Sequence, residues 1–262
     1  MTKRSLAAAL SVMAMASVMF AQDKPKPAAQ PGPHPKSNLE IAALNKMFSA
    51  QTPDDRIAAG EEVIANFEKT EFKSIVFFTI ADAYRQKDDD VKMVVYGERA
   101  LEADPKNYQA SLLLAQGIAR KVRENDLDRD ERLNTAEKYA NQALASIPDA
   151  IKMNANMTDD QWADTKKDLM ADAHQALGII AMGRKKWDVA VTEYTAAVTM
   201  AHTPDPVAMV RLAQADNKIG KYDDAIMYAD KVMAIEKIPA SVKQVAQAER
   251  VRAFGAKAAA AK

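Results

Sequence analysis

Few side chains in this sequence have the types and spacing that chemistry requires. The sequence contains no cysteine, which excludes thiol catalysis, cysteine metal sites and disulfides. Its three histidines, His34, His174 and His202, include no pair four residues apart, the spacing that lets two histidines bind one metal ion from a helix. We therefore predict no metal and no cofactor, and we assign each histidine a structural or neutral role.

The acidic run Asp88–Asp90 is a second candidate, because carboxylates bind calcium. Its spacing is not that of a calcium-binding loop, and aspartates also favour the turn before a helix, where they interact with the helix dipole. The sequence has no glycine-rich phosphate loop and no G-x-S-x-G nucleophile elbow. We predict that the run is a solvated turn and that the protein is not an enzyme.

The N-terminus has the order of residues found in a secretory signal peptide. Lys3 and Arg4 precede the apolar run Leu6–Phe20, which ends at the small residue Ala21. The run is shorter than the roughly 20 apolar residues of a membrane-spanning helix, so retention as a membrane anchor is the less favoured alternative. We predict a signal peptide over residues 1–21, with the exact cleavage bond open, no membrane span in the mature chain, and a periplasmic or extracellular location.

The charge of the chain argues against nucleic acid as a partner. There are 36 basic and 36 acidic residues, and removing Lys3 and Arg4 leaves 34 basic residues against 36 acidic ones. Binding to phosphates needs a basic stripe, whereas the charges here are interspersed. Residues 22–37 contain many prolines and few apolar residues, which predicts an extended linker before the folded part.

From about residue 38 the sequence is rich in helix-forming residues, and a pattern of two helices repeats along it. In the first helix the inward residues are spaced i, i+3, i+4 and i+7: Phe77, Ile80, Ala81 and Tyr84. In the second helix Met93, Gly97, Ala100 and Leu101 point inward, and the helix ends before a proline, which cannot continue it. The pattern recurs with first helices around Ser111–Ile118, His174–Ala181 and Met209–Asp216, and second helices around Ala136–Leu144, Ala190–Val198 and Ala225–Met233.

The distance between equivalent residues supports this repeat. Ala190 and Ala225 are 35 residues apart, whereas Ala100 and Ala143 are 43 apart. The excess over a repeat of about 34 residues is roughly nine residues, which we assign to the charged segment Lys121–Arg132. Because an insertion between two paired helices leaves the stacking register intact, we expect it at one rim of the array.

The repeats resemble the tetratricopeptide repeat family over about residues 74–239. The most family-like residues are His174-x-x-Leu177-Gly178-x-x-Ala181, then Lys186-Trp187-Asp188-x-Ala190 and Tyr194-x-x-Ala197, with Lys221-Tyr222-Asp223-x-Ala225 in the next repeat. This resemblance implies an all-α fold, a right-handed superhelical α-α solenoid of tetratricopeptide-like helix pairs. In that family the first helix of each pair lines a concave surface that binds proteins or peptides.

These patterns predict the domain organisation of the chain. The chain begins with a signal peptide at 1–21, a Pro-rich linker at 22–37 and an N-terminal helix pair at 38–73 that is a degenerate repeat or a cap. Four repeats follow: one at 74–107, one at 108–150 with an insertion of about nine residues near 121–132, one at 158–204 with an extended first helix, and one at 205–239. The chain ends with a C-terminal capping helix at 240–256 and a disordered tail at 257–262. Thr158 and Gln161 have the spacing of a capping box, so the extended helix should begin there and run for some 24 residues. We expect Trp162 on this extension to pack against the preceding repeat, and the capping helix to have a polar outer face.

The resemblance places the binding groove on one face of each first helix. Counting along these helices gives its residues: Phe78, Asp82, Arg85, Leu112, Gln116, Gln175, Ile179, Met182, Val210, Gln214 and Asn217. The mixture of amides, charges and apolar groups suits an extended peptide or a partner helix. Members of the family that clamp a C-terminal carboxylate begin their groove with Lys and Asn, and Phe78 and Asp82 stand there instead, which disfavours such a ligand.

Two functions follow from the sequence. We favour a non-catalytic protein-protein interaction scaffold that binds an unidentified protein or peptide in this groove. The alternative is a structural or self-assembling spacer subunit of a cell-envelope complex, for which self-association would be needed. An enzyme is the third class, and no residue pattern in the sequence supports it.

Overall fold

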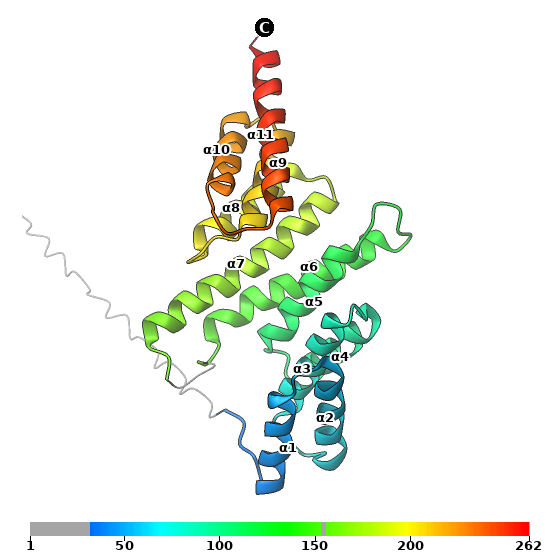
Figure 1. The fold of residues 1–262 in the computed structure, drawn as a ribbon. Helices are drawn as coiled ribbons and strands as arrows, with labels where there is room; N and C mark the ends of the chain where they lie inside the picture. Colours follow the sequence, from blue (N-terminus) through cyan, green and yellow to red (C-terminus); the bar gives the residue numbers. More distant parts are fainter. Residues whose placement is uncertain (1–31, 153–155, 262) are drawn as a thin grey trace, which may run out of the picture. The chain divides into compact units, whose positions relative to one another are not determined.

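The computed structural model describes residues 32–152 and 156–261, and within these ranges it contains eleven α-helices, one short 3-10 helix and no strand (Figure 1). The helices are α1 (Asn38–Ser49), α2 (Pro53–Asn66), α3 (Lys73–Gln86), α4 (Asp90–Ala103), α5 (Tyr108–Lys121), α6 (Arg129–Ser146), η1 (Ile147–Asp149), α7 (Asp159–Gly183), α8 (Trp187–Met200), α9 (Pro206–Lys218), α10 (Tyr222–Met233) and α11 (Ala240–Ala260). The predicted signal peptide and most of the predicted linker lie outside the described residues. No helix within the described ranges is both long and apolar enough to cross a membrane.

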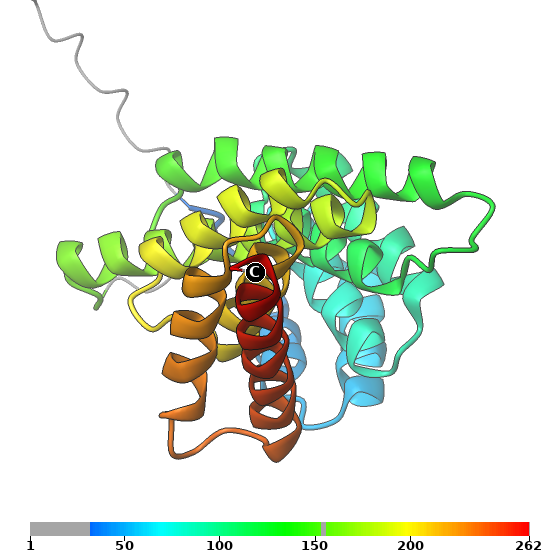
Figure 2. The same ribbon diagram turned by 90° about the horizontal axis from the view of Figure 1, so that it is seen from above.

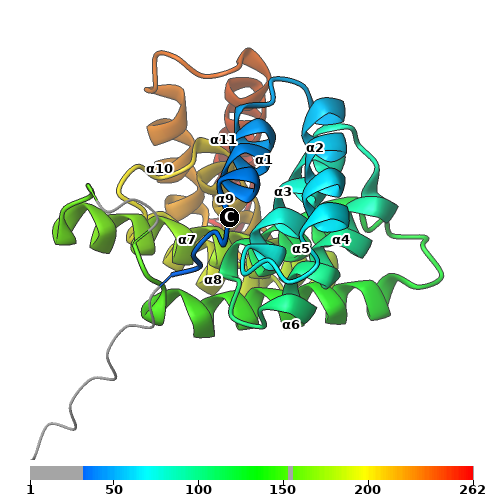
Figure 3. The same cartoon turned by 90° about the horizontal axis from the view of Figure 1, so that it is seen from below.

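The helices pack as an all-α solenoid in which each helix contacts the next one along the chain. The most extensive packing is within the pairs α3–α4, α5–α6 and α7–α8, and α10 packs against both α9 and α11. Some first helices of neighbouring pairs also touch, as α3 touches α5 and α5 touches α7. Figure 3 shows α1 beside α2 at the N-terminal side of this array, and Figure 2 shows α10 and α11 together at the other end, in orange and red.

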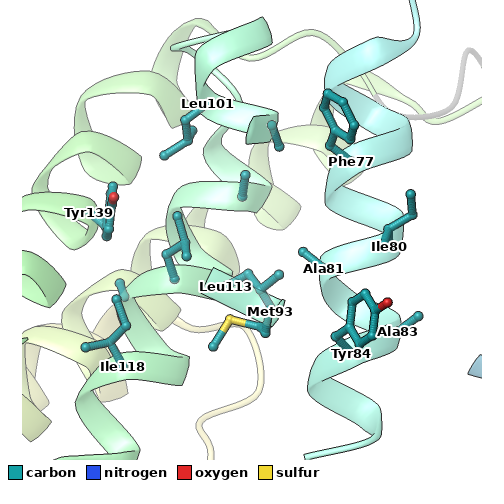
Figure 4. Packing of buried hydrophobic residues seen from close by; sticks show 14 of the residues in the cluster. Phe77, Ile80, Ala81, Ala83, Tyr84, Met93, Leu101, Leu113, Ile118 and Tyr139 are labelled. Atoms are coloured by element: carbon teal, nitrogen blue, oxygen red, sulfur yellow. The ribbon is translucent and has the colours of Figure 1, made fainter. Parts of the chain in front are cut away.

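The predicted inward residues form the core of the array. Phe77, Ile80, Ala81 and Tyr84 of α3 are all buried, as are Met93, Gly97, Ala100 and Leu101 of α4. Figure 4 shows these α3 side chains along the helix, with Ala81 on the side of Met93 and Leu113 and with Ile80 on the opposite side. Small residues let the paired helices approach closely, because a Cβ atom at Gly178 of α7 would lie 2.8 Å from ring carbons of Tyr194 on α8.

The first helix of the third complete pair has the extra length that the sequence predicts. It runs from Asp159 to Gly183, and Thr158 and Gln161 form the expected capping box at its start. Trp162 is buried, and its indole Nε1 donates a hydrogen bond to the backbone carbonyl oxygen of Ala150 at 3.1 Å. The tryptophan therefore holds the first turns of α7 against the end of the preceding pair.

The inserted segment lies between α5 and α6, and it is partly loop and partly an early start of α6. The guanidinium group of Arg129 donates to the backbone carbonyl oxygen of Gly183, and Arg184 donates to Glu137 at 2.8 Å. The amino group of Lys185 lies 2.6 Å from a carboxylate oxygen of Glu124 in the loop. The contacts of Arg129 and Lys185 fasten the inserted segment to the end of α7 and the turn that follows it, and the contact of Arg184 joins the same turn to α6 beyond the segment.

The C-terminal helix is longer than the sequence predicts. We predicted a capping helix over residues 240–256 and a disordered tail over residues 257–262, but α11 continues to Ala260. The prediction was wrong for residues 257–260, because alanine has the highest helix propensity of all residues and four alanines follow Lys257. Lys262 lies outside the described residues.

Candidate functional site

A pocket of about 510 Å³ lies where α3, α5 and α7 meet. Its lining consists of Phe78, Asp82 and Arg85 of α3, Asp88 and Asp90 at the start of α4, Gln109, Leu112, Leu113, Gln116, Gly117, Arg120 and Lys121 of α5, and Leu169 of α7. Phe78 is half-buried and Leu112 is buried, so apolar side chains supply one part of the wall. First helices of three successive pairs thus contribute to one cavity.

Charged side chains of both signs occupy the rest of the pocket wall, and most are paired. The guanidinium Nη2 of Arg85 lies 2.7 Å from Oδ1 of Asp82, one turn earlier on α3. The amino group of Lys121 lies 3.1 Å from Asp90 and 3.5 Å from Asp88, so it joins the end of α5 to the turn before α4. The hydrogen bond to Asp90 raises the pKa of Lys121, which keeps this group cationic.

The wall on the α7 side is fixed by Gln116. Its side-chain amide Nε2 donates to the backbone carbonyl oxygen of Asp172 at 3.3 Å, which links α5 to α7 directly. Burial raises the pKa of the Asp172 carboxyl group, the negative charge of Asp205 raises it further, and Arg120 lowers it. Arg120 is exposed and lines the pocket, so its charge acts on both the pocket and this carboxyl group.

The structure brings five of the eleven predicted groove residues together in this pocket: Phe78, Asp82, Arg85, Leu112 and Gln116. Gln175, Ile179, Met182 and Gln214 are half-buried outside it. Ile179 and Met182 pack against the cluster formed by residues such as Ala190 and Tyr194. On α7 the face that was counted as groove is therefore partly used for packing between pairs.

The two remaining predicted residues are covered by α11. Val210 is buried in a cluster with Ala229, Val232 and Ala246, and the side-chain amide of Asn217 donates to Glu249 of α11. These two side chains do not lie in an open groove, because α11 packs against α9, as α5 packs against α3 and α7 against α5. The sequence predicts a capping helix over residues 240–256, but the pattern within α9 does not show that this helix would cover Val210 and Asn217.

Some pocket residues were not predicted by counting along the first helices. Arg120 follows Gln116 by one helical turn, so the same spacing carried one turn further would have found it. Lys121, Asp88, Asp90 and Leu169 had no such signal, because their part in the pocket depends on how α5 packs against α3 and α7.

The histidines take separate positions. His174 Nδ1 lies 2.7 Å from Oε2 of Glu193 on the neighbouring helix, and the backbone amides of His34 and His202 donate to Glu71 and Asp168. Within residues 32–152 and 156–261, no group of three or more His, Asp or Glu side chains is arranged to hold a metal ion.

Comparisons with known proteins define the class of the fold. No protein-family model matches the sequence, and a search of the curated proteins also gives no match. The solved structure of PilW, described as a widely conserved type IV pilus biogenesis factor, is similar with 16% identity over 84% of this chain and 90% of that chain, at a TM-score of 0.57. A thermophilic tetratricopeptide repeat protein of Thermus thermophilus matches with 15% identity over 83% of this chain and 94% of that chain, at a TM-score of 0.49. A tetratricopeptide repeat protein of Parabacteroides merdae matches with 13% identity over 85% of this chain and 93% of that chain, at a TM-score of 0.41.

The fold is therefore that of a tetratricopeptide-type repeat protein, an all-α solenoid of helix pairs. At these levels of identity the likeness concerns the fold alone, and it carries no residue of PilW or of the other proteins over to this chain.

Proposed function

We propose that this chain is a non-catalytic interaction scaffold that binds a segment of another protein in the pocket between α3, α5 and α7. The observation that carries this proposal is the composition of the pocket. Three first helices converge there, one apolar wall from Phe78 and Leu112 stands beside paired charges, and the volume is about 510 Å³. That volume falls within the range of small ligand sites, roughly 300–1,000 Å³, so it can take one or two large side chains of a bound segment.

The pocket chemistry indicates what kind of segment would bind. An apolar side chain would be stabilised by leaving water against Phe78 and Leu112. The ion pairs Arg85–Asp82 and Lys121–Asp90 leave no large excess of either charge at the edge of the pocket. We therefore propose an extended peptide or a partner helix with one apolar anchor and polar neighbours, rather than a chain terminus or a strongly charged tail.

Export of the chain belongs to the same proposal. It rests on the N-terminal order of Lys3, Arg4 and the apolar run Leu6–Phe20. PilW is described as a factor of type IV pilus biogenesis, and its similarity in fold supports our proposal that this chain acts in the cell envelope. The partner would then be an exported or envelope protein.

A photo-crosslinking residue placed in the pocket tests the proposal. Benzoylphenylalanine at position 78 replaces an aromatic side chain of the pocket, and the same residue at position 48 replaces Phe48, which is 53% exposed on α1 outside the pocket. We expect irradiation of living cells to crosslink a defined partner from position 78 and not from position 48. Identical products from both positions, or none from position 78 in a folded protein, would refute the proposed site.

A further inference from the structure

The C-terminal helix α11 ends the array with a face that contacts no other helix within the described chain. Its opposite face packs against α9 and α10, as each first helix packs against the pair before it. In a complete repeat the free face of such a helix would be covered by a second helix, and no further helix follows α11 in the described residues. Figure 1 shows the last turns of α11 extending beyond the ends of α9 and α10.

The free face of α11 carries no charge. We define it by exposed residues spaced three and four apart: Gln244, Gln247, Ala248, Val251, Phe254, Gly255 and Ala258. Val251 is 59% exposed and Phe254 is 46% exposed. The outer surface of α11 thus combines polar residues, as the sequence predicts for a terminal helix, with the exposed apolar side chains of Val251 and Phe254.

Four of the five charged side chains of α11 are held in ion pairs. Arg250 pairs with Asp230 at 2.6 Å, Lys257 pairs with Asp223, and Arg252 pairs with the buried carboxylate of Glu249 at 2.6 Å. These charges flank the free face, and the guanidinium carbon of Arg250 lies 4.8 Å from the centre of the Phe254 ring at its edge.

Gly255 is a second observation on the free face. Four other glycines inside helices stand where another element packs closely: a Cβ atom would lie within 2.6–2.9 Å of a neighbouring side chain at Gly60, Gly97, Gly117 and Gly178. A Cβ atom at Gly255 would meet nothing within 4 Å. Glycine inside a helix is less stable than alanine by about 1 kcal/mol, and at Gly255 no contact within the described chain accounts for it.

We propose that the free face of α11 binds the same face of a second copy of this chain, with the two helices antiparallel and a twofold axis at Val251. In that arrangement Phe254 of one copy lies opposite Ala248 of the other, because both are three residues from Val251. The large side chain of Phe254 thus packs against the small side chain of Ala248 on both sides of the axis. Gly255 has no side chain, so it allows the backbones of the two helices to approach each other. An uncharged face can pair with itself without repulsion between like charges, and a contact of this kind closes at two copies.

The size of the contact sets its strength. The surface area that one helix face on each copy can bury is smaller than in specific protein interfaces, which bury about 1,200–2,000 Å² in total. We therefore infer a dimer with a dissociation constant in the micromolar range. The pocket between α3, α5 and α7 is formed by other helices, so this proposal and the proposed function can fail separately.

Charge at the twofold axis tests the dimer. Sedimentation velocity over a wide range of concentrations should show reversible association of the wild-type protein. Val251→Glu and Val251→Lys should each weaken it by roughly a hundredfold, because each places two like charges together on the axis, and an equimolar mixture of the two variants should restore it. Val91→Glu is the matched control, since Val91 is 76% exposed on α4, and it should associate like the wild type.

Several outcomes would overturn the proposal. A wild-type protein that stays monomeric at all concentrations excludes the dimer, and so does a Val251→Glu variant that associates normally. Growth beyond two copies would indicate a head-to-tail contact, for example between α11 and the exposed Leu39 and Phe48 of α1. A mixture of the two charged variants that fails to associate would exclude the antiparallel arrangement about Val251. Circular dichroism of each variant verifies that it is folded.

Discussion

The side-chain amide nitrogen of Asn217 on α9 lies 3.0 Å from both the backbone carbonyl oxygen and the carboxylate Oε2 of Glu249 on α11. Glu249 is 3% exposed, so the amide satisfies a carboxylate that has been removed from water. Asn217 was predicted to face a binding groove, but its donor group joins the C-terminal helix to the last complete pair.

Asn217→Ala should destabilise the protein by about 1–3 kcal/mol, because it leaves a buried carboxylate without one of its donors. Urea unfolding followed by circular dichroism measures the change. Asn141→Ala is the matched control, since Asn141 is exposed on α6 and the same substitution there changes helix propensity alone. Equal effects of the two substitutions would show that the contact with Glu249 contributes nothing.

Asp216 should make stability depend on pH. Its carboxyl group is 1% exposed, its Oδ2 has no hydrogen-bond partner, and burial raises its pKa to about 7 from 3.8, with a further increase from Asp224 and a decrease from Lys221. The folded protein therefore keeps this proton between about pH 4 and pH 7, whereas the unfolded chain releases it. The contribution of this group to stability is full below about pH 4 and is lost as the pH rises through about 7.

Asp216→Asn should remove that dependence, because the amide has a similar shape and does not titrate. We expect the wild type to lose up to about 4 kcal/mol of stability between about pH 4 and pH 8 through this group, and the variant to lose less. The urea concentration at the midpoint of unfolding, measured across this pH range, gives the change in stability of the wild type and of the variant. Parallel curves for wild type and variant would show that Asp216 is ionised in the folded protein at neutral pH.

Gly178 and Gly255 should respond to alanine in opposite directions. A Cβ atom at Gly178 would lie 2.8 Å from the ring of Tyr194, which is fully buried and cannot move aside, so Gly178→Ala should cost about 1–3 kcal/mol. Gly255→Ala should stabilise the monomer by up to about 1 kcal/mol, because no atom opposes the methyl group and alanine favours the helix. Thermal unfolding at low protein concentration compares them, and a stabilising Gly178→Ala would contradict the close approach of α7 and α8.

Gln116 and Gln214 should differ in their effect on a captured partner. Gln116 lines the pocket between α3, α5 and α7, whereas Gln214 on α9 does not. Gln116→Ala should weaken partner binding by roughly 1 kcal/mol, or about fivefold, because it removes the hydrogen bond to the backbone carbonyl of Asp172 that fixes the α7 side of the pocket. Gln214→Ala should leave partner binding unchanged. Titration calorimetry with the partner measures both, and a larger loss from Gln214→Ala would place the binding site further along the array.

Local signals made the helices predictable. Prolines, the capping box at Thr158 and the i, i+3, i+4 spacing of small and apolar residues act within one or two turns, so they can be read from the sequence. The early start of α6 at Arg129 and the continuation of α11 to Ala260 were less clear, since charged and alanine-rich residues suit both a helix and a loop end.

The pocket was only partly predictable, because it depends on packing between helices. Phe78 and Gln116 were found from helical spacing, but Leu169 and Asp88 reach the pocket through the relative placement of α3, α5 and α7. Val210 fits the groove pattern equally well, and it is buried because α11, which comes about thirty residues later in the chain, covers it. No periodicity within α9 contains that information.

The contacts of Arg129 and Arg184 across the insertion bear on how the array opens. In a linear repeat protein each helix pair contacts mainly its neighbouring pairs, so local unfolding can begin at either end and spread inward. The bonds from Arg129 to Gly183 and from Arg184 to Glu137 join residues 54 and 47 positions apart, and they must break together before α6 and α7 separate. Amide hydrogen exchange should therefore be slowest in the central helices and faster in α1 and α11, which leaves the α5–α7 wall of the pocket intact while the ends of the chain fluctuate.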